Sequence, residues 1–548
     1  MVTSSHARLG EFFVRWGWAC ALAIVAVGFV LRVGGVSGYW INPDEGIYLD
    51  STRDWKGLVQ VYQGNAHPPL FYVVVYLMRL LSDSFEFVRV FALICGCAAI
   101  YGVYMLGREV AGTANGLVAA LILALSPGAV EHSQIIRPYM LEIMFLVYGL
   151  AFLARYLRTG GIGNLWVYSV AFILAVLTHY SAFMVVGALG ITLGALLLGR
   201  GLDRRHFKPL LLASLPVVLV MVYLYYWHIK PELAGKGLQQ QAQDGWLRIH
   251  MVHDLAQLWY HGIGVVRYLF GVGAPRGATA VAEGPMLALF LAGLVLAVWR
   301  RNHLVYALPL VMLAVAIGAA SAQQYPFSVT RHSMYLAPIL ILPMALPIAA
   351  GLRANWVGTG VTLAALLALT YGRGPVNDVL RVSRYSGNAL TEQVLPIEVL
   401  PSVFPALQEV QESGWPLIIN GQTFNTLLPL FAGAPDSRAW TGPALYWFRW
   451  GRSPVLVSGS WKMNLNPTLR ETVGHFDHLL DQITVTLPEL GIRNRTRVLL
   501  AFAGWDFDLP HALEQLNKQR PPESKFVTWA LSHPLAPFII LQLDLTKY

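Results

Sequence analysis

Two adjacent carboxylates, Asp44 and Glu45, stand in the stretch NPDEGIYLD directly after a long apolar segment. A carboxylate in such a place can take the proton from a hydroxyl group as that group attacks a substrate. A structural interpretation is also open, because Pro, Asp and Glu all suit the first turn of a helix. The two residues alone do not decide between catalysis and helix initiation.

Other ionisable and aromatic residues recur at the ends of later apolar segments. This group comprises His67, Glu131, His132, Arg137, Tyr139, Glu142, His179, Tyr180, Arg331 and His332. Arginines stabilise an anionic phosphate leaving group through paired donors, so acids and arginines together predict a group-transfer site. The sequence has no Walker loop, GxGxxG or HExxH motif, so it indicates neither a nucleotide nor a zinc ion. We therefore expect an activated group that is carried on a lipid phosphate.

Most members of this group also have a structural interpretation. His179 can simply hydrogen-bond a neighbour at the end of a span, and His67 with the two prolines after it can be a rigid helix start. Arg137 and Arg331 can anchor in lipid headgroups. These alternatives remain open for each residue taken alone.

Glu142 is harder to explain structurally. It lies about one turn into MLEIMFLVYGL, an otherwise apolar segment. A carboxylate at that depth requires a partner or a hydrated cavity. Tyr139 is three positions earlier and shares its helix face.

The composition of the 548-residue chain indicates a polytopic α-helical membrane protein. Hydrophobic residues make up 56% of it and its mean hydropathy is +0.53, which is too apolar for a soluble enzyme of this size. The net charge of +9 does not indicate nucleic-acid binding. Most of the arginine clusters lie in short loops between apolar segments, where basic residues orient helices. We expect a lipid bilayer and no nucleic acid as partner.

The positive-inside rule predicts about eleven spans and a cytoplasmic N-terminus marked by Arg8 and Arg15. We expect the first span, from Trp16 to Val36, to be retained rather than cleaved as a signal peptide. Within the segment 67–84, the stretch from Pro68 to Ser82 offers about 15 residues, or ~22 Å of helix, against a hydrocarbon core of ~30 Å, so we expect a membrane-surface helix there. The remaining spans are expected at residues 87–107, 112–127, 139–156, 164–180, 181–199, 208–228, 284–300, 304–321, 333–350 and 355–371.

This map places the candidate residues on the extracytoplasmic side and basic anchors in the cytoplasmic loops. We also expect surface helices around VVRYLF in the stretch 229–283. After Tyr371 the composition changes, and residues 372–548 contain the β-rich runs PLIING, RVLLAFAGW and FIILQLDL. PLIING is followed by a helix-like stretch, QTFNTLLPLFAG, and strand-then-helix units predict a small α/β domain. We thus expect a transmembrane catalytic domain, 1–371, and an extracytoplasmic α/β domain, 372–548.

Several short motifs occur in an order that resembles a known superfamily. DEGIY, HPPLFY, GREVAG, RPYMLE, THYSA and an arginine at the head of a late span resemble the GT-C glycosyltransferases. Glycosyltransferase family 39, the protein O-mannosyltransferase-like group, is most similar, and the lipid A aminoarabinose transferases are also similar. The resemblance spans residues 10–350 and implies a GT-C fold, a polyprenyl-phosphate sugar donor and an extracytoplasmic acceptor.

The resemblance also implies a catalytic group and a phosphate-binding group. Asp44, with Glu45 beside it, would act as base or orient the acceptor. Arg331, at the head of a late span, would face the donor phosphate together with Arg137 and His332. A divalent metal ion near the acids is compatible with the sequence but is not required by it.

The remaining candidates would bind substrate. Glu142 follows an arginine by five residues, which is the spacing of the family, although the aminoarabinose transferases have Asp there. His67 precedes the Pro-Pro pair, where those relatives often have Lys. Tyr139, His179 and Tyr180 complete this group.

Three functions are weighed on these observations. The first is an inverting glycosyltransferase, in a bacterial inner or plasma membrane, that acts on a glycan, lipid or protein hydroxyl. The second is a transporter or flippase of a lipid-linked or anionic solute, which would show inverted repeats or broken helices that are not seen in the sequence. The third is a membrane scaffold, which leaves Glu142 and the arginines unexplained. We favour the glycosyltransferase.

Overall fold

The computed structural model describes most of the chain. It covers residues 2–38, 40–63, 67–199, 201–230, 246–270, 284–353, 358, 361, 400–431, 439–442, 445–458, 497–503, 517–525, 527–532 and 538–544. The chain divides into two compact units, one made of Met1–Val36 with Thr52–Arg384 and the other of Ser37–Ser51 with Tyr385–Tyr548. The segment that carries Asp44 and Glu45 therefore belongs to the second unit. The domain boundary predicted at residue 371 lies outside the described residues.

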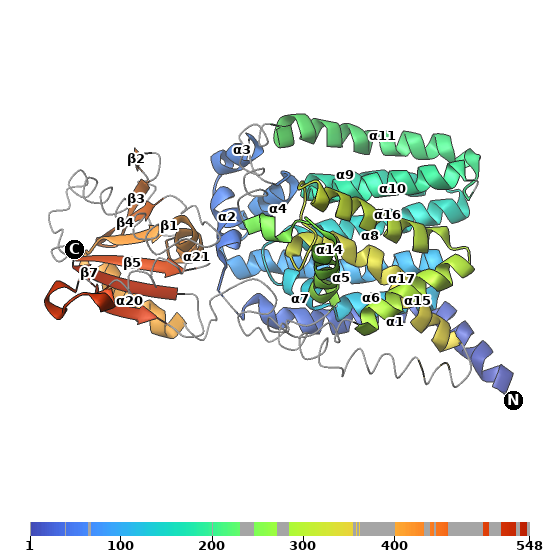
Figure 1. Cartoon of the computed structure of the whole chain (residues 1–548), viewed down its shortest axis with the longest axis horizontal. Coiled ribbons are helices and arrows are strands. Elements are labelled where there is room, and N and C mark those ends of the chain that lie inside the picture. Colours follow the sequence, from blue (N-terminus) through green and yellow to red (C-terminus); the bar gives the residue numbers. More distant parts are fainter. Residues whose placement is uncertain are drawn as a thin grey trace. The chain divides into compact units, whose positions relative to one another are not determined.

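The described part of the first unit is helical (Figure 1). Its α-helices are α1 (Val2–Val36), α3 (Trp55–Gln63), α4 (Leu70–Arg79), α5 (Phe85–Ala111), α6 (Thr113–Ala124), α7 (Pro127–His132), α8 (Tyr139–Thr159), α9 (Gly163–Thr178), α10 (Ser181–Leu198), α11 (Phe207–Leu224), α14 (Leu255–Phe270), α15 (Gly284–Trp299), α16 (His303–Ser321) and α17 (Ala337–Arg353). Short helical turns are η1 (Arg204–His206), η2 (Tyr225–Ile229), η3 (Trp246–His250) and η4 (Arg331–Leu336).

Seven of the described helical segments are long and apolar enough to cross a membrane. They are Arg15–Val36, Phe85–Ala111, Tyr139–Thr159, Ser181–Leu198, Arg204–Ile229, His303–Ser321 and Arg331–Arg353. Every predicted span up to 333–350 coincides with a helix, although α6, α9 and α15 are shorter than the seven. The segment 355–371 lies outside the described residues, apart from Gly358 and Val361, so the count of eleven stays a prediction. The prediction of a multi-pass helical membrane protein is confirmed.

Helix α4 is shorter than the sequence indicated. It contains ten residues, which gives ~15 Å of helix, about half the thickness of a hydrocarbon core. Two prolines precede it and Pro69 is its N-cap residue. This length agrees with a helix that does not cross the bilayer. The VVRYLF stretch forms the end of α14, as expected for a helix in that region.

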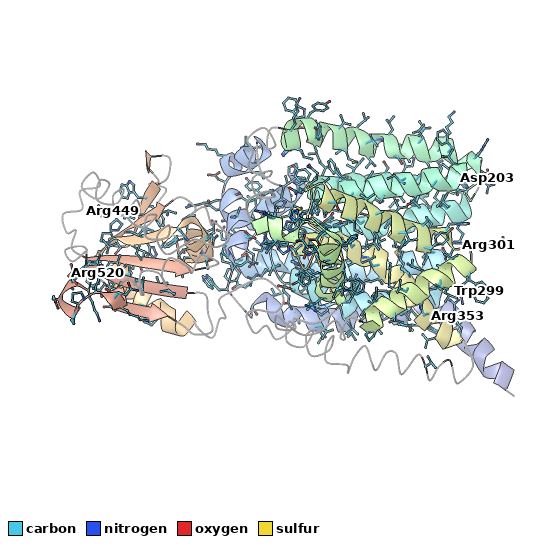
Figure 2. All side chains as sticks on the ribbon, viewed as in Figure 1. Asp203, Trp299, Arg301, Arg353, Arg449 and Arg520 are labelled. Atoms are coloured by element: carbon cyan, nitrogen blue, oxygen red, sulfur yellow. The ribbon has the colours of Figure 1, made fainter. Side chains whose placement is uncertain are left out.

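Charged residues mark one end of the helical unit. Asp203, Arg301 and Arg353 lie at that end, whereas α3 and α4 lie at the opposite end (Figures 1 and 2). Arg353 donates to the carbonyl of Ala111 at the C-terminus of α5. The chain then turns into α6 through Gly112, whose φ of +92° is rarely adopted by residues with a side chain.

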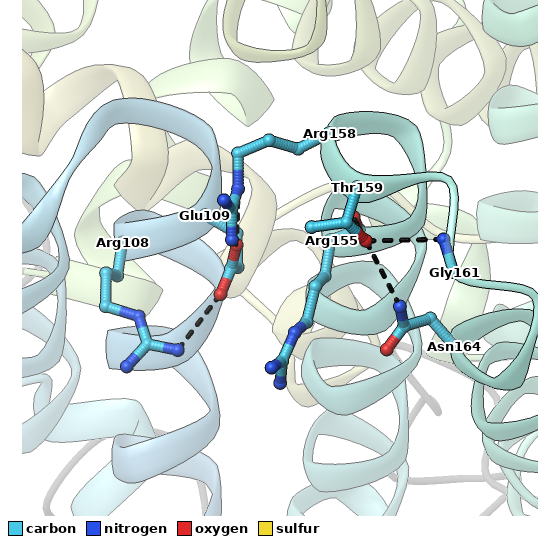
Figure 3. A network of polar contacts seen from close by, with 7 residues as sticks. All are labelled: Arg108, Glu109, Arg155, Arg158, Thr159, Gly161 and Asn164. Carbon is cyan, nitrogen blue, oxygen red and sulfur yellow. Dashed lines mark hydrogen bonds and ion pairs between the residues drawn. The ribbon is translucent and has the colours of Figure 1, made fainter.

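An ion-pair network links two of the long helices (Figure 3). Glu109 on α5 binds Arg108 at 2.9 Å and Arg158 on α8 at 2.6 Å. The Glu109 side chain is only 3% exposed, so this carboxylate depends on the two guanidinium groups. Arg158 therefore links α8 to α5, whereas Arg108 lies on the same helix as Glu109.

Arg32 is a buried cation inside the first span, and the sequence reading did not identify its role. Its guanidinium donates to the carbonyls of Gly28 and Ala124 at 3.0 Å and of Leu123 at 3.2 Å, and to Ser133 Oγ at 3.0 Å. Leu123 and Ala124 are the last residues of α6, so the positive charge caps the negative end of that helix.

A second buried arginine acts in the same way. Arg89 on α5 donates to the carbonyl of Val36, the last residue of α1, at 3.0 Å. Its guanidinium carbon also lies 4.9 Å from the centre of the Phe85 ring. Arg89 therefore fixes the point at which the chain leaves the first unit.

The second unit contains a seven-stranded sheet with the order β2-β3-β4-β1-β5-β7-β6. Its elements are α2 (Pro43–Ser51), α20 (Leu400–Ser413), β1 (Leu417–Asn420), α21 (Gly421–Phe431), β2 (Ala439–Gly442), β3 (Leu445–Trp450), β4 (Ser453–Ser458), β5 (Arg497–Ala503), η6 (Pro522–Ser524), β6 (Val527–Ser532) and β7 (Phe538–Asp544). The central β1 is parallel to both β4 and β5, and the other pairings are antiparallel. All four β1 residues are buried, as is typical of a central parallel strand. The predicted C-terminal α/β architecture is confirmed.

Replacing Arg32 tests its role as a cap. In Arg32→Met the carbonyls of Leu123 and Ala124 lose a charged donor, and each such bond is worth ~1.5–3 kcal/mol. We expect a loss of about 3 kcal/mol or more in stability, measured as a lower Tm in detergent. Arg205→Met is the matched control, because the Arg205–Asp203 pair is exposed and should contribute less than ~1 kcal/mol. Equal Tm values for the two variants would contradict the role of Arg32.

Candidate active site

The two adjacent carboxylates have different surroundings at the start of α2. The backbone N–H of Glu45 donates to Asn42 Oδ1 at 2.9 Å, and the N–H of Asn42 donates to Glu45 Oε2 at 3.0 Å. This reciprocal pair is a capping box with Asn at the N-cap position. Glu45 is fully buried and Asp44 is half-buried. The structural interpretation of the DE pair thus applies to Glu45, and Asp44 beside it is the candidate base.

In the first unit, Glu142 receives a partner from the α9–α10 junction. Ser181 Oγ donates to Glu142 Oε1 at 2.5 Å and lies 2.6 Å from His179 Nδ1. The other carboxylate oxygen of Glu142 is 3.4 Å from the same ring nitrogen. All three side chains are buried, so the hydroxyl joins a carboxylate and an imidazole in a site shielded from water.

Tyr139 lies among three of the predicted imidazoles. Its ring centre is 4.8 Å from that of His132, 5.1 Å from that of His179 and 6.4 Å from that of His332. His67, which precedes α4, stacks on His179 at 5.4 Å. These five residues therefore form one group of neighbouring rings, which we call the ring layer.

The positive charges of Arg137 and Arg331 affect the pKa values of histidines in and near the ring layer. Burial, together with the positive charges of Arg137 and Arg331, lowers the pKa of His132 well below its ordinary value. Burial, with the charges of His261 and Arg331, lowers the pKa of His250 to about 4. Both imidazoles are therefore neutral at pH 7, and the arginines supply the positive charge that an anion would meet.

Several residues of this layer were not identified from the sequence. Ser181 follows THY in a motif that was noted for its histidine and tyrosine. Tyr268, in the apolar α14, has its hydroxyl 2.5 Å from His132 Nε2. Tyr325 lies 5.9 Å from His332 between ring centres, and its burial raises its pKa well above the ordinary value. The sequence carried a signal for Ser181 in the THYSA motif and for Tyr325, which precedes Arg331 in the stretch YPFSVTRH, but none for Tyr268.

The predicted site residues are not all brought together. Tyr180 contacts Phe183 edge-on at 5.8 Å, which is a packing contact along its own helix. Asp44 and Glu45 lie in the second unit and the other candidates in the first. Within the described residues, no three His, Cys, Asp or Glu side chains are grouped so that they could hold a metal ion.

An apolar cavity of about 410 Å³ lies between α14, α15, α16 and α17. Its lining is wholly hydrophobic and includes Trp259, Phe290, Phe327 and Leu340. Phe327 and Leu340 flank the η4 turn that begins with Arg331. An ideal Cβ on Gly264 would lie 3.0 Å from the Val329 nitrogen, so α14 packs closely on the segment before that arginine. Residues on both sides of η4 therefore contribute to the cavity lining.

Comparisons with known proteins agree with this architecture. Residues 66–227 match the family described as dolichyl-phosphate-mannose-protein mannosyltransferase. ArnT from Cupriavidus metallidurans in the apo state has a TM-score of 0.55 at 13% identity, and the match covers 97% of this chain and 99% of that chain. No curated protein matches the sequence.

A second solved structure is similar over a smaller share. The Archaeoglobus fulgidus oligosaccharyltransferase tethered with an acceptor peptide has a TM-score of 0.51 at 14% identity. The match covers 76% of this chain but only 63% of that chain, so this protein spans less than two thirds of its length. The chain has the GT-C glycosyltransferase fold, and the resemblance predicted from the motifs is confirmed. The family match supports a glycosyl-transferring enzyme.

The lowered pKa values predict how stability depends on pH. Between the folded pKa of His132 or His250 and the ordinary value near 6.5, the unfolded chain binds more protons than the folded one. Stability is therefore fully present above pH 6.5 and declines as the pH falls. In His132→Gln the free energy of unfolding should decline less steeply between pH 7 and pH 5, by up to ~1.4 kcal/mol per pH unit. The measurement is a smaller fall in Tm over this range than in the wild type. Parallel curves for wild type and variant would show that His132 titrates normally.

Proposed function

We propose that this protein is an integral-membrane glycosyltransferase. It moves a sugar from a polyprenyl-phosphate donor to a hydroxyl group of an extracytoplasmic acceptor, with inversion at the anomeric carbon. The observation that carries this proposal is that Arg331 begins η4, while Phe327 and Leu340 on either side of η4 line an apolar cavity. A lipid phosphate is the ligand class that needs both features.

The donor is assigned to the first unit by its chemistry. The phosphate requires fixed positive charge, which Arg331 and the buried Arg137 supply. Its polyprenyl tail requires apolar surface, which the cavity lining supplies. The matching family is named for a mannose donor linked to dolichyl phosphate, which supports a lipid-linked donor. The identity of the sugar is set by the pocket shape rather than by these features.

The chemical step follows from the two groups of residues. The acceptor oxygen forms a bond to the anomeric carbon while the bond from that carbon to the phosphate oxygen breaks. The electron pair leaves with the phosphate, whose negative charge Arg331 and Arg137 stabilise, so the leaving group needs no proton. The acceptor proton passes to the carboxylate of Asp44. Attack from the face opposite the phosphate inverts the anomeric centre.

The network around Glu142 has a supporting part in this proposal. Ser181 ties Glu142 to His179, and His179 is in ring contact with both His67 and Tyr139. These contacts bring imidazole rings and hydroxyl groups together, and such groups can hydrogen-bond the hydroxyls of a sugar.

The membrane orientation is part of the proposal. Arg301 and Arg353 share one end of the helical unit, and α4 lies at the other. The positive-inside rule then places the α4 end, and with it the site, outside the cytoplasm. The N-terminus would be cytoplasmic, and a bacterial plasma membrane fits this reading.

The assay that tests the function follows labelled sugar from a panel of polyprenyl-phosphate donors. Purified protein in detergent is supplied with native membranes as acceptor source, and the product is separated from the donor. We expect transfer by the wild type from at least one donor. Solute flux in vesicles without any transferred label would instead support a transporter.

The two carboxylates should differ in this assay. Asp44→Asn removes the proposed base, and we expect transfer to fall by a factor of ~10²–10⁴. Glu45→Gln keeps an oxygen that can complete the capping box, so its transfer should stay within about threefold of wild type. Both variants should retain the wild-type Tm within a few degrees. Near-full activity of Asp44→Asn would remove the base from the mechanism.

The cavity can be tested with donors of different tail length. Gly262 lines the cavity and has open space at its Cβ, so Gly262→Phe would fill the cavity without a backbone clash. We expect KM for a long polyprenyl donor to rise ~10-fold or more, since ~1–3 kcal/mol of apolar contact is lost. A donor with a truncated tail should be affected much less. Gly190→Phe, also in open space but outside the lining, is the control. The same KM change for both donors would contradict a tail-binding cavity.

A further inference from the structure

The helix that carries Asp44 packs on the C-terminal domain at a glycine. An ideal Cβ on Gly46 would lie 2.1 Å from the carbonyl oxygen of Asn425 and 2.7 Å from its Cα. The obstructing atoms are backbone atoms of α21, which no side-chain rotation can move away. Only glycine allows α2 and α21 to approach this closely, and Gly46 is two residues from Asp44.

A second contact holds the other side of the capping box. Trp40 Nε1 donates to the carbonyl of Thr426 at 2.6 Å. The Trp40 side chain also packs against the core cluster of the sheet domain. Gly46 and Trp40 therefore flank the first turn of α2 and contact consecutive residues of α21, Asn425 and Thr426.

Helix α21 is itself firmly placed. It follows directly on β1, the central strand of the sheet, and Asn420 Oδ1 accepts from the N–H of Thr423 in its first turn. Phe424, Leu427 and Phe431 on its inner face are buried in the domain core. A continuous series of contacts thus leads from the sheet through α21 to α2.

We propose that α21 sets the position of Asp44, the proposed base, through Gly46 and Trp40. Gly46 and Trp40 are then positioning residues, and this role rests on the proposed function. A base displaced by about 1 Å from its reacting geometry can lose ~10² in rate. A change in the packing of α2 on α21 should therefore change kcat.

The experiment compares two glycine substitutions on the same pair of helices in the full-length protein. Gly46→Ala adds a methyl group against the α21 backbone, whereas Gly421→Ala adds one in open space at the start of α21. We expect kcat of Gly46→Ala to fall 10- to 100-fold while KM for the donor changes less than twofold, because the donor residues lie in the first unit. Gly421→Ala should match the wild type.

Hydrogen exchange of residues 43–51 gives a second readout that does not need activity. The α2 amides, including Gly46 N–H, which donates to the Asn42 carbonyl at 3.1 Å, should exchange faster in Gly46→Ala than in Gly421→Ala. Trp40→Phe, which removes one N–H donor and keeps an aromatic ring, should show smaller changes of the same kind in kcat and exchange. It provides the test if Gly46→Ala does not fold.

The outcomes separate this inference from the proposed function. If kcat of Gly46→Ala, or of Trp40→Phe in its place, equals that of Gly421→Ala, α21 does not position the base and the inference is wrong. If the wild type transfers sugar from no donor, the proposed function fails. In that case hydrogen exchange still tests the packing role. Equal exchange of the α2 amides in all variants would overturn it, and faster exchange in Gly46→Ala would support it.

Discussion

The geometry of the helical unit depends on the buried guanidinium of Arg32. A cation inside a membrane span is costly unless its donors are satisfied, and Arg32 meets this requirement with three carbonyls and one hydroxyl. It caps α6, a helix of twelve residues, at its C-terminus. Its bond to Ser133 holds the segment that follows α7, which leads directly to Arg137 and Tyr139. The candidate site residues therefore follow directly on a helix end that Arg32 caps inside the protein.

The same rule of satisfied polar groups extends through the ring layer. Glu142 is tolerated in an apolar helix because Ser181 and His179 reach it from the α9–α10 junction. His132 is tolerated because Tyr268 bonds its ring nitrogen. These hydrogen bonds restrict the side chains that they join, although His132 Nδ1 and Glu142 Oε2 make no hydrogen bond within the described residues. The residues that satisfy these buried groups are thus the same residues that form the candidate site.

Much of this could be predicted from the sequence, for identifiable reasons. Apolar segments gave the helices because hydropathy is local, and PLIING, RVLLAFAGW and FIILQLDL gave β1, β5 and β7 because buried strands are continuously apolar. The roles of Arg32 and Arg89 were missed, since an arginine near the end of a span has the same pattern whether it caps a helix or reaches the headgroups. The pairing of Tyr268 with His132 was missed because it joins residues far apart in sequence. The sequence analysis predicted a catalytic role for Glu45, but its carboxylate accepts a hydrogen bond in the capping box. Asn42, three positions earlier, was the signal that indicates such a box.

The division of the site residues between two units carries a further consequence. The chain leaves the first unit after Val36, which Arg89 holds, and returns to it at Thr52. Segment 37–51 is therefore tethered at both ends to the membrane unit while its own packing is with the sheet domain. A short segment with two fixed ends has little conformational freedom left to lose, so placing the carboxylate on it costs little further entropy. The proposed base is therefore carried on a segment whose two ends join it to the first unit and whose packing lies in the second unit.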